Sequence, residues 1–325
     1  MPGGVAPGSA AAGGMERAAV LKRMGLCDGK VIDAQAPASC IEVYVAPDAD
    51  ERKQLVDVLK IDEHTLLSAL DPDELSRIEF EPDHAALIIK RPKNYSSEDN
   101  FLFSVFSVGL FVFTDRLIII QGDDSPLLDG RPFTNIRSVQ DVLLRIIYST
   151  IFHFEKHLKV INALSDELEK EINTAMTNKH LLNLFTLEKS LVYYLNAINT
   201  NAKLIEKMRN NVARLGLTPE QVEFLDDLGI ENNQCYELAE IYSQVLASLM
   251  DARVSVVSNN LNVLMKTLTL VMIAIMLPTL VISAFSMNVR LPVEQEMGTV
   301  SFWIIMGLAG GSTFAVWLFW RLKGR

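Results

Sequence analysis

Residues 267–287 read TLTLVMIAIMLPTLVISAFSM and contain no charged side chain. At about 1.5 Å of rise per residue, a helix of this length crosses the roughly 30 Å hydrocarbon core of a bilayer. Residues 300–320, VSFWIIMGLAGGSTFAVWLFW, are also uncharged, and Trp303, Trp317 and Trp320 stand where interfacial aromatic side chains belong. The sequence therefore predicts two transmembrane helices.

Only residues 288–299 separate these two stretches, so the helices are predicted to form a hairpin joined by an extracytoplasmic loop. Lys266 precedes the first stretch and a basic tail, residues 321–325, follows the second, whereas Arg290 is the only basic residue of the loop. The protein is expected in a bacterial-type inner or plasma membrane. Because cytoplasmic flanks of membrane helices are enriched in Lys and Arg, both termini are expected on the cytoplasmic side.

A third apolar stretch, residues 101–120, is not predicted to cross the membrane. It contains Asp115 and Arg116 and is rich in Phe, Val and Ile. These features favour two buried strands around a turn at Thr114 and Asp115 over a membrane span.

The rest of the first part of the chain mixes strand and helix signals. Residues 40–46 and 85–91 read as strands, and residues 50–70 between them read as helical. With the Phe- and Val-rich hairpin, they predict a mixed sheet flanked by helices, a cytoplasmic α/β domain over residues 21–137. Residues 1–20 are rich in Gly, Ala and Pro and are expected to be a flexible tail.

Strand signals end near residue 138, and long amphipathic helices are predicted at 138–172 and about 180–215. Thr218 and Gln221 then form a capping-box-like start of a third helix, which is predicted to continue into the first span. Residues 138–266 are thus expected to form a cytoplasmic helical domain and a stalk helix. The fold class is α+β: a mixed α/β domain, a long helical stalk and a two-helix transmembrane hairpin.

Composition excludes several classes of protein. The formal net charge of -10 argues against a nucleic-acid partner and suits cations. Cys27, Cys40 and Cys235 are too few and scattered for a disulfide framework or a metal knuckle. The sequence contains no nucleotide-binding loop, nucleophile elbow or paired catalytic carboxylates, so it is not predicted to be an enzyme.

His153 and His157 stand four residues apart on a predicted helix, a spacing that can bind Zn²⁺. The segment is HFEKH rather than HExxH, so Glu155 does not occupy the metalloprotease position. Both histidines are predicted to be surface residues.

Two spans per chain cannot enclose a pore, so a pore would require several copies, with one helix from each lining the axis. If the first span lines it, one face of the helix is the candidate pore lining. The side chains on that face are Asn262, Met265, Thr269, Met272, Met276, Thr279, Ser283 and Met287. The alternative, that this face packs against lipid or the second helix, stays open. In the second span, Gly307 and Gly311 form a GxxxG pattern that permits close helix contact.

Three segments carry a resemblance to a known family. They are NVLMKTLTLVMIAIMLPTLVISAFSMNVRLP with the following short loop and basic tail, ALDPDELSRIEFEPDHAALIIKRP, and LEKSLVYYLNAINTN. Together they resemble the CorA magnesium-transporter superfamily over nearly the whole chain. The resemblance implies a funnel-like homopentamer in the lipid bilayer, with a central pore lined by the first span. It also implies passive transport of divalent cations, Mg²⁺ above all, with Co²⁺, Ni²⁺ or Zn²⁺ as other cargoes.

The family signature is Gly-Met-Asn at the outer end of the first span, and Ser286, Met287 and Asn288 occupy the matching positions. The resemblance implies a selectivity ring of Asn288 carbonyls that meets the hydrated ion, since Mg²⁺ gives up its water reluctantly. It also implies a polar inner opening and an apolar constriction in the pore. The matching positions are Asn262, Met265, Leu268 and either Met276 or Leu277.

The motif departs from the family pattern in two ways. Ser286 replaces a glycine where a helix ends, so left-handed or tightly packed geometry there is expected to be strained. Arg290 would add one positive charge per subunit near the mouth, opposing divalent ions, although Glu294 and Glu296 can pair with it. The alternative function is therefore a CorA-like pentamer that does not select magnesium. It would transport zinc, pass ions non-selectively or act as a regulatory scaffold under membrane stress.

Acidic residues cluster in the soluble part. Most are expected to form a solvated surface, but carboxylates from neighbouring subunits can also repel one another until a divalent cation bridges them. The resemblance implies such an intersubunit sensor at Asp227 together with Glu98 or Asp99. A divalent cation would then be both cargo and regulator.

Overall fold

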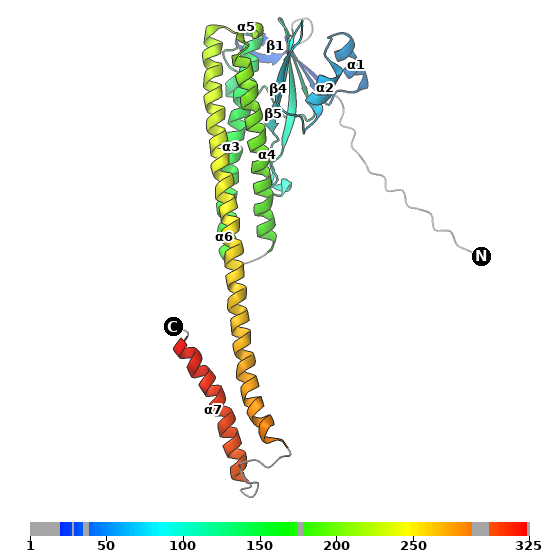
Figure 1. The fold of residues 1–325 in the computed structure, drawn as a ribbon. Helices are drawn as coiled ribbons and strands as arrows, with labels where there is room; N and C mark the ends of the chain where they lie inside the picture. The colour runs from blue at the N-terminus through cyan, green and yellow to red at the C-terminus, as the bar shows by residue number, and fades with distance from the viewer. Residues whose placement is uncertain (1–19, 28, 35–38, 175–177, 288–298, 324–325) are drawn as a thin grey trace, which may run out of the picture. The chain divides into compact units, whose positions relative to one another are not determined.

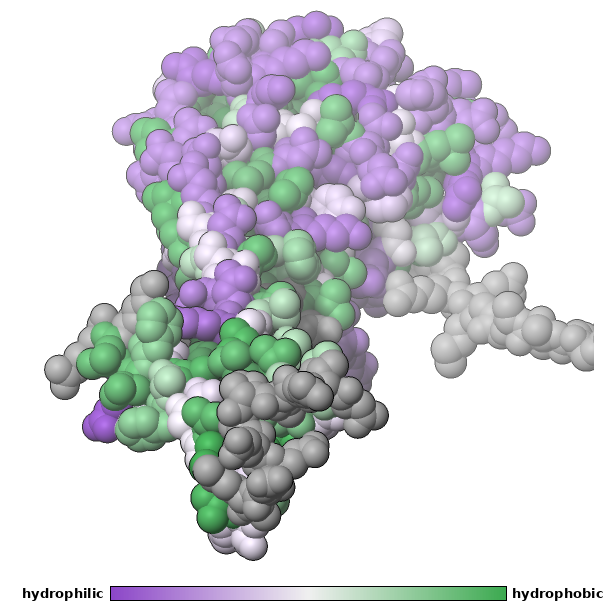
Figure 2. Space-filling view, turned by 60° about the horizontal axis from the view of Figure 1, so that its bottom comes forward, coloured by the Kyte–Doolittle hydropathy of each residue, from purple (hydrophilic) through white to green (hydrophobic). Residues whose placement is uncertain are grey.

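The computed structural model describes residues 20–27, 29–34, 39–174, 178–287 and 299–323. The chain divides into two compact units, Met1–Leu249 and Met250–Arg325. The first unit contains a sheet and long helices, and the second contains two apolar helical segments (Figure 1). In Figure 2 the surface of the first unit is largely hydrophilic and that of the second is largely hydrophobic.

The first unit is built on a seven-stranded sheet with the order β2-β1-β3-β7-β6-β5-β4. The strands are β1 (Val20–Cys27), β2 (Lys30–Asp33), β3 (Ile41–Val45), β4 (Arg77–Phe80), β5 (Ala85–Pro92), β6 (Val105–Val112) and β7 (Leu117–Gln121). Only β3 and β7 pair in parallel, and the other neighbours are antiparallel. The predicted soluble hairpin is confirmed, because β6 and β7 pair from Val108 with Gln121 to Val112 with Leu117.

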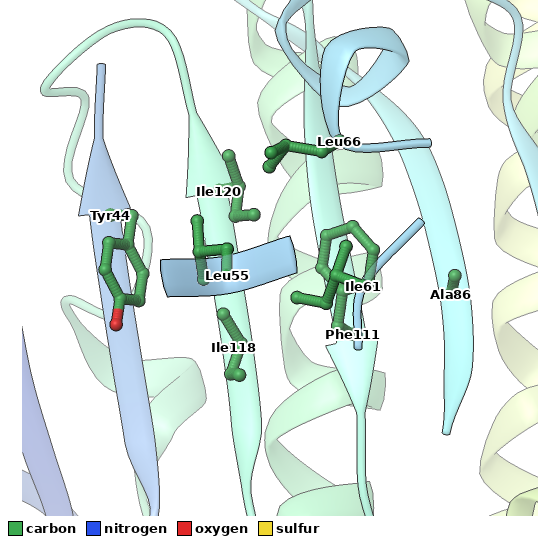
Figure 3. Packing of buried hydrophobic residues seen from close by; sticks show 8 residues of the cluster. All are labelled: Tyr44, Leu55, Ile61, Leu66, Ala86, Phe111, Ile118 and Ile120. Atoms are coloured by element: carbon green, nitrogen blue, oxygen red, sulfur yellow. The ribbon is translucent and has the colours of Figure 1, made fainter. Parts of the chain in front are cut away.

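One face of the sheet is covered by α1 (Ala49–Asp57) and α2 (Glu63–Leu70). The side chains that pack there are Tyr44, Leu55, Ile61, Leu66, Ala86, Phe111, Ile118 and Ile120 (Figure 3). The closest approach is at Gly109, where an added Cβ would lie 2.6 Å from the Cβ of Ala69. A glycine in β6 therefore lets α2 lie directly on the sheet.

The single helix predicted at residues 50–70 is wrong, because α1 and α2 are separate. Lys60 adopts a left-handed φ of 56° between them. Asp62 then caps α2, since its carboxylate accepts a hydrogen bond from the backbone N–H of Thr65 at 2.9 Å. A new cap three residues before Thr65 starts a second helix in a different direction.

Three long helices and a short one follow the sheet. They are α3 (Val139–Thr174), α4 (Asn178–Arg209), α5 (Val212–Leu215) and α6 (Pro219–Phe285). The segment predicted as one helix at 180–215 is thus α4 and α5, and Gly216, with φ of 66°, ends the second of them. Both α3 and α4 pack against β5, and α4 also packs against β4.

Asn201 on α4 joins this helix to the sheet through its buried amide. β4 reaches only as far as the pair Arg77–Ile88, so Lys90 of β5 has no strand partner on that side. The Oδ1 of Asn201 accepts from the N–H of Lys90 at 3.0 Å, and its Nδ2 donates to the carbonyl of Lys90 at 2.9 Å. Ser76 Oγ donates to the same Oδ1 at 2.6 Å. The side chain of Asn201 therefore continues the hydrogen bonding of β4 along β5.

The long third helix is confirmed as α6, which has 67 residues and a length of about 100 Å. Its start is the predicted capping box: Thr218 N donates to Gln221 Oε1 at 2.9 Å, and Gln221 N donates to Thr218 Oγ1 at 3.3 Å. Pro278 lies inside the helix without ending it. The last helix is α7 (Thr299–Lys323).

Candidate functional site

Two described helices, Pro219–Phe285 and Thr299–Leu322, are long and apolar enough to cross a membrane. Within the second unit, one face of α6 is turned toward α7. Its side chains are the partly covered ones, and they recur every three or four residues. They are Leu270, Ala274, Leu277, Pro278, Val281 and Phe285. Leu270, Ala274 and Leu277 line clefts together with Ser312, Thr313 and Val316 of α7.

The candidate pore-lining residues lie on the other side of α6. All of them are exposed: Asn262, Met265, Leu268, Thr269, Met272, Met276, Thr279, Ser283 and Met287. At 3.6 residues per turn, this face (the free face) is centred roughly opposite the one that α7 covers. Thr269 stands at its border, because it also lines a cleft with α7. Of the two constriction candidates, Met276 is 67% exposed on the free face, whereas Leu277 lies on the α7 side.

Two threonine hydroxyl groups on the free face donate hydrogen bonds to carbonyls of their own helix. Thr269 Oγ1 donates to the carbonyl of Met265 at 2.8 Å, and Thr279 Oγ1 donates to that of Ile275 at 2.7 Å. Because the hydrogen is used inside the helix, the oxygen lone pairs remain to accept from water. The free face therefore carries both apolar methionine and leucine side chains and hydroxyl acceptors.

The motif is described only in part. α6 ends at Phe285, and Ser286 donates from its hydroxyl to the carbonyl of Ile282 at 2.8 Å. The described residues with a left-handed φ do not include Ser286, so the expected left-handed strain is absent. Met287 follows directly. Asn288, Arg290, Glu294 and Glu296 lie outside the described residues.

The candidate sensor residues belong to the first unit. Asp227 is exposed on α6, and Glu98 and Asp99 are exposed in the short helix η1 (Ser97–Asp99). The carboxylate of Asp99 accepts from the backbone N–H of Ser96 at 2.6 Å and from its hydroxyl at 3.0 Å, and these bonds lower the pKa of Asp99. Across the described residues, no three His, Cys, Asp or Glu side chains converge as metal ligands. A sensor at these positions would need a second copy of the chain.

The prediction that His153 and His157 are surface residues is wrong for His157, and His153 is half-buried. His157 is buried, with its Nδ1 2.7 Å from the hydroxyl of Tyr194, and its Nε2 lies 3.1 Å from the Nε2 of His153. Burial lowers the pKa of His157 to about 4. It lowers the pKa of His153 to about 3, with further contributions from the neighbouring His157 and from the positive charge of Arg91. Both rings are therefore neutral structural groups on α3.

Acidification should destabilise this buried pair. The unfolded histidines titrate near pH 6.5, so below that pH the unfolded state binds more protons than the folded one, and stability is lost as pH falls. Between pH 6.5 and 5.5 we expect a loss of about 1 to 2 kcal/mol, allowing for solvent screening. Unfolding of the full-length protein in detergent at both pH values measures it.

The double variant His153→Gln, His157→Gln should lose most of this pH dependence. A residual slope is expected from His84, because burial also lowers its pKa. An unchanged slope in the double variant would contradict the assignment.

A large unit built on a sheet and long helices is followed by two apolar helices, which is the architecture of a membrane-anchored protein. A family model described as "CorA-like Mg2+ transporter protein" matches residues 43–323. The chain belongs to this family, as the three quoted segments predict.

Individual relatives agree. The cobalt/magnesium transport protein CorA of Methanocaldococcus jannaschii is 23% identical over 299 residues, which cover 86% of this chain and 92% of the relative. The complete structure of the CorA magnesium transporter from that organism has a TM-score of 0.76 at 20% identity, covering 95% of this chain and 99% of that one.

Two more distant structures share the fold. Full-length CmaX has a TM-score of 0.67 at 14% identity and covers 95% of this chain and 98% of its own. The cytoplasmic domain of ZntB from Vibrio parahaemolyticus has a TM-score of 0.53 at 16% identity, covering 72% and 96%. At these identities the likenesses bear on fold alone, and they confirm the α+β class.

Proposed function

We propose that this chain is one subunit of a homopentameric channel that passes divalent metal cations, chiefly Mg²⁺, passively across a bacterial-type inner or plasma membrane. The observation that carries the proposal is the free face of α6, an exposed row of methionine, leucine and hydroxyl side chains opposite the face that α7 covers. Two helices enclose no pore, so the free faces of several copies would surround the axis.

The order of residues along the free face fits a pathway for a hydrated ion. Asn262 supplies a polar inner opening, Met272 and Met276 supply apolar rings that oppose wetting, and Thr279 and Ser283 supply oxygen acceptors farther along. In this proposal residues 267–287 line the pore and residues 300–320 form the outer helix. Lys266 and the basic tail, residues 321–325, favour cytoplasmic termini.

Selection and regulation would come from residues at the two ends of the pathway. Asn288 would ring the outer mouth and accept hydrogen bonds from the ion's water shell, because a neutral amide can select Mg²⁺ without stripping that water. Asp227 with Glu98 or Asp99 would bind a regulatory divalent cation between neighbouring subunits. The exposure of all three carboxylates leaves them available to a second copy.

A second candidate function keeps the pentamer but not the selectivity for magnesium. Its motive is the motif itself, since Ser286 stands in place of glycine and Arg290 adds positive charge near the mouth. Such a protein would transport zinc, pass ions non-selectively or serve as a scaffold. The structural likeness to ZntB and CmaX is compatible with this reading but bears on fold alone.

Two adjacent residues of α6 provide the test, because Met276 lies on the free face and Leu277 lies on the side toward α7. Met276→Asn should raise Mg²⁺ influx into proteoliposomes by about tenfold, because a polar ring lowers the barrier to wetting and about 1.4 kcal/mol corresponds to that factor. Leu277→Asn is the matched control: it introduces the same side chain on the face toward α7 and should not raise influx.

A magnesium-sensitive dye inside the liposomes measures the influx, and size-exclusion chromatography verifies that each variant is a folded oligomer. Equal rises for both variants, or a rise for Leu277→Asn alone, would exclude the free face as the pore lining.

A further inference from the structure

Two adjoining clefts lie between α6 and α7 in the second unit. Their volumes are about 980 and 450 Å³. They share the four lining residues Lys266, Leu270, Val316 and Trp320. The α6 residues that line them lie mainly on the face turned away from the candidate pore. The cleft pair is thus a feature separate from the proposed ion pathway, and the inference drawn from it does not depend on which ion the protein carries.

The lining is apolar along its length and cationic at one end. Lys266 lines both clefts and is the only charged residue of the segment 254–285. Trp320 lines both clefts and Trp317 lines the second, and the guanidinium of Arg321 lies 5.2 Å from the centre of the Trp317 ring. No Asp or Glu lines either cleft, and no described carboxylate forms an ion pair with Lys266.

This charge pattern restricts the occupant. A polar solute would lose its hydration against the apolar walls without gaining hydrogen bonds, and a purely apolar occupant would leave Lys266 without an anion. A phospholipid with a negatively charged headgroup satisfies both requirements. Its acyl chains match the walls, and its phosphate matches Lys266 in the lining and Arg321 beside the lining residue Trp317. Tryptophan side chains also prefer the level of the headgroups.

We propose that the cleft pair binds an anionic phospholipid, with its acyl chains along the apolar walls and its phosphate between Lys266 and Arg321. A helix from a second copy of the chain fits less well, because it would place an apolar surface against Lys266. Lys266 directly precedes the uncharged span, residues 267–287. The lipid headgroup would therefore lie at the end of the membrane helices that is closest in sequence to the first unit. Thr269 belongs both to the first cleft and to the border of the free face.

Retention of lipids by the full-length protein tests this site. Native mass spectrometry of protein equilibrated with an equal mixture of phosphatidylglycerol and phosphatidylcholine should show preferential binding of phosphatidylglycerol. Two basic residues acting on one headgroup give an expected preference on the order of thirtyfold. The double variant Lys266→Gln, Arg321→Gln should reduce it to near unity.

Lys159→Gln is the control, because it removes a positive charge from α3, where Lys159 pairs with Glu155 at 2.5 Å. It should keep the preference of the parent. Millimolar inorganic phosphate should not displace the lipid, and displacement would overturn the acyl-chain assignment. Equal retention of the two lipids by the parent, or an undiminished preference in the double variant, would overturn the proposal. A parent that retains no lipid would also overturn the proposal. If the double variant then changed the size of the oligomer, a second copy of the chain would be the occupant of the clefts.

Discussion

Magnesium influx into proteoliposomes should fall to background when Asn288 is replaced by alanine. The proposed channel selects the ion through its bound water, and alanine offers no side-chain oxygen to that water. The measurement compares parent and Asn288→Ala with a magnesium-sensitive dye, at equal amounts of reconstituted oligomer. Undiminished influx in the variant would show that Asn288 does not select the ion.

A parent protein that carries no magnesium would instead favour the second candidate function. The pair of changes Ser286→Gly and Arg290→Ala restores the family glycine and removes the positive charge. If these two residues cause the inactivity, the double variant should gain magnesium influx. An inactive double variant would refute that explanation.

Replacing Asn201 by alanine should destabilise the first unit by about 2 to 4 kcal/mol, since the buried carbonyl of Lys90 would lose its partner and the N–H of Lys90 would keep only its 3.2 Å bond to Ser76 Oγ. Ser76 would lose an acceptor as well. Hydrogen exchange of the β5 amides in the full-length protein measures the local effect, and thermal unfolding measures the global one.

Asn199→Ala is the matched control, two residues away on the exposed side of α4. Its effect should stay within about 0.5 kcal/mol. Similar exchange rates at β5 in both variants would mean that the amide of Asn201 does not hold the strand.

The membrane helices and the start of α6 were predictable because local chemistry determines them. An uncharged stretch of sufficient length has few alternatives to a membrane helix. The capping box needs only Thr218 and Gln221, three residues apart, and both of its hydrogen bonds form. Helical spacing alone also places residues such as Met272 and Met276 on one face of α6, but the sequence left open whether α7 covers that face.

Other features depend on tertiary pairing. β1 carries Lys22 and Arg23 and has no clear alternation, and it becomes a strand because it pairs with β3 from Val20 with Val45 to Met24 with Ile41. β4 has only four residues, too few for a periodic signal. The break between α1 and α2 did leave a local signal that the prediction missed, because Asp62 stands three residues before Thr65 in a capping position.

The histidine pair shows how a local pattern can mislead. His157 lies next to Leu158 and three residues after Phe154, both fully buried, so the apolar face of α3 already included it. The departure from HExxH argued against a metal site, but the prediction of two surface residues overlooked that apolar face. The contact with Tyr194 on α4 could not be predicted from sequence, because it joins positions 37 residues apart.

The strand-like role of Asn201 also has a consequence for biosynthesis. Lys90 leaves the ribosome 111 residues before Asn201. At about 5 to 20 residues per second, this delay is roughly 6 to 22 s. Throughout that interval the outer edge of β5 beyond Ile88 lacks its partner and can pair with a strand of another nascent chain. Completion of α4 closes that edge, so a chain released before residue 201 would be a substrate for chaperones or proteases.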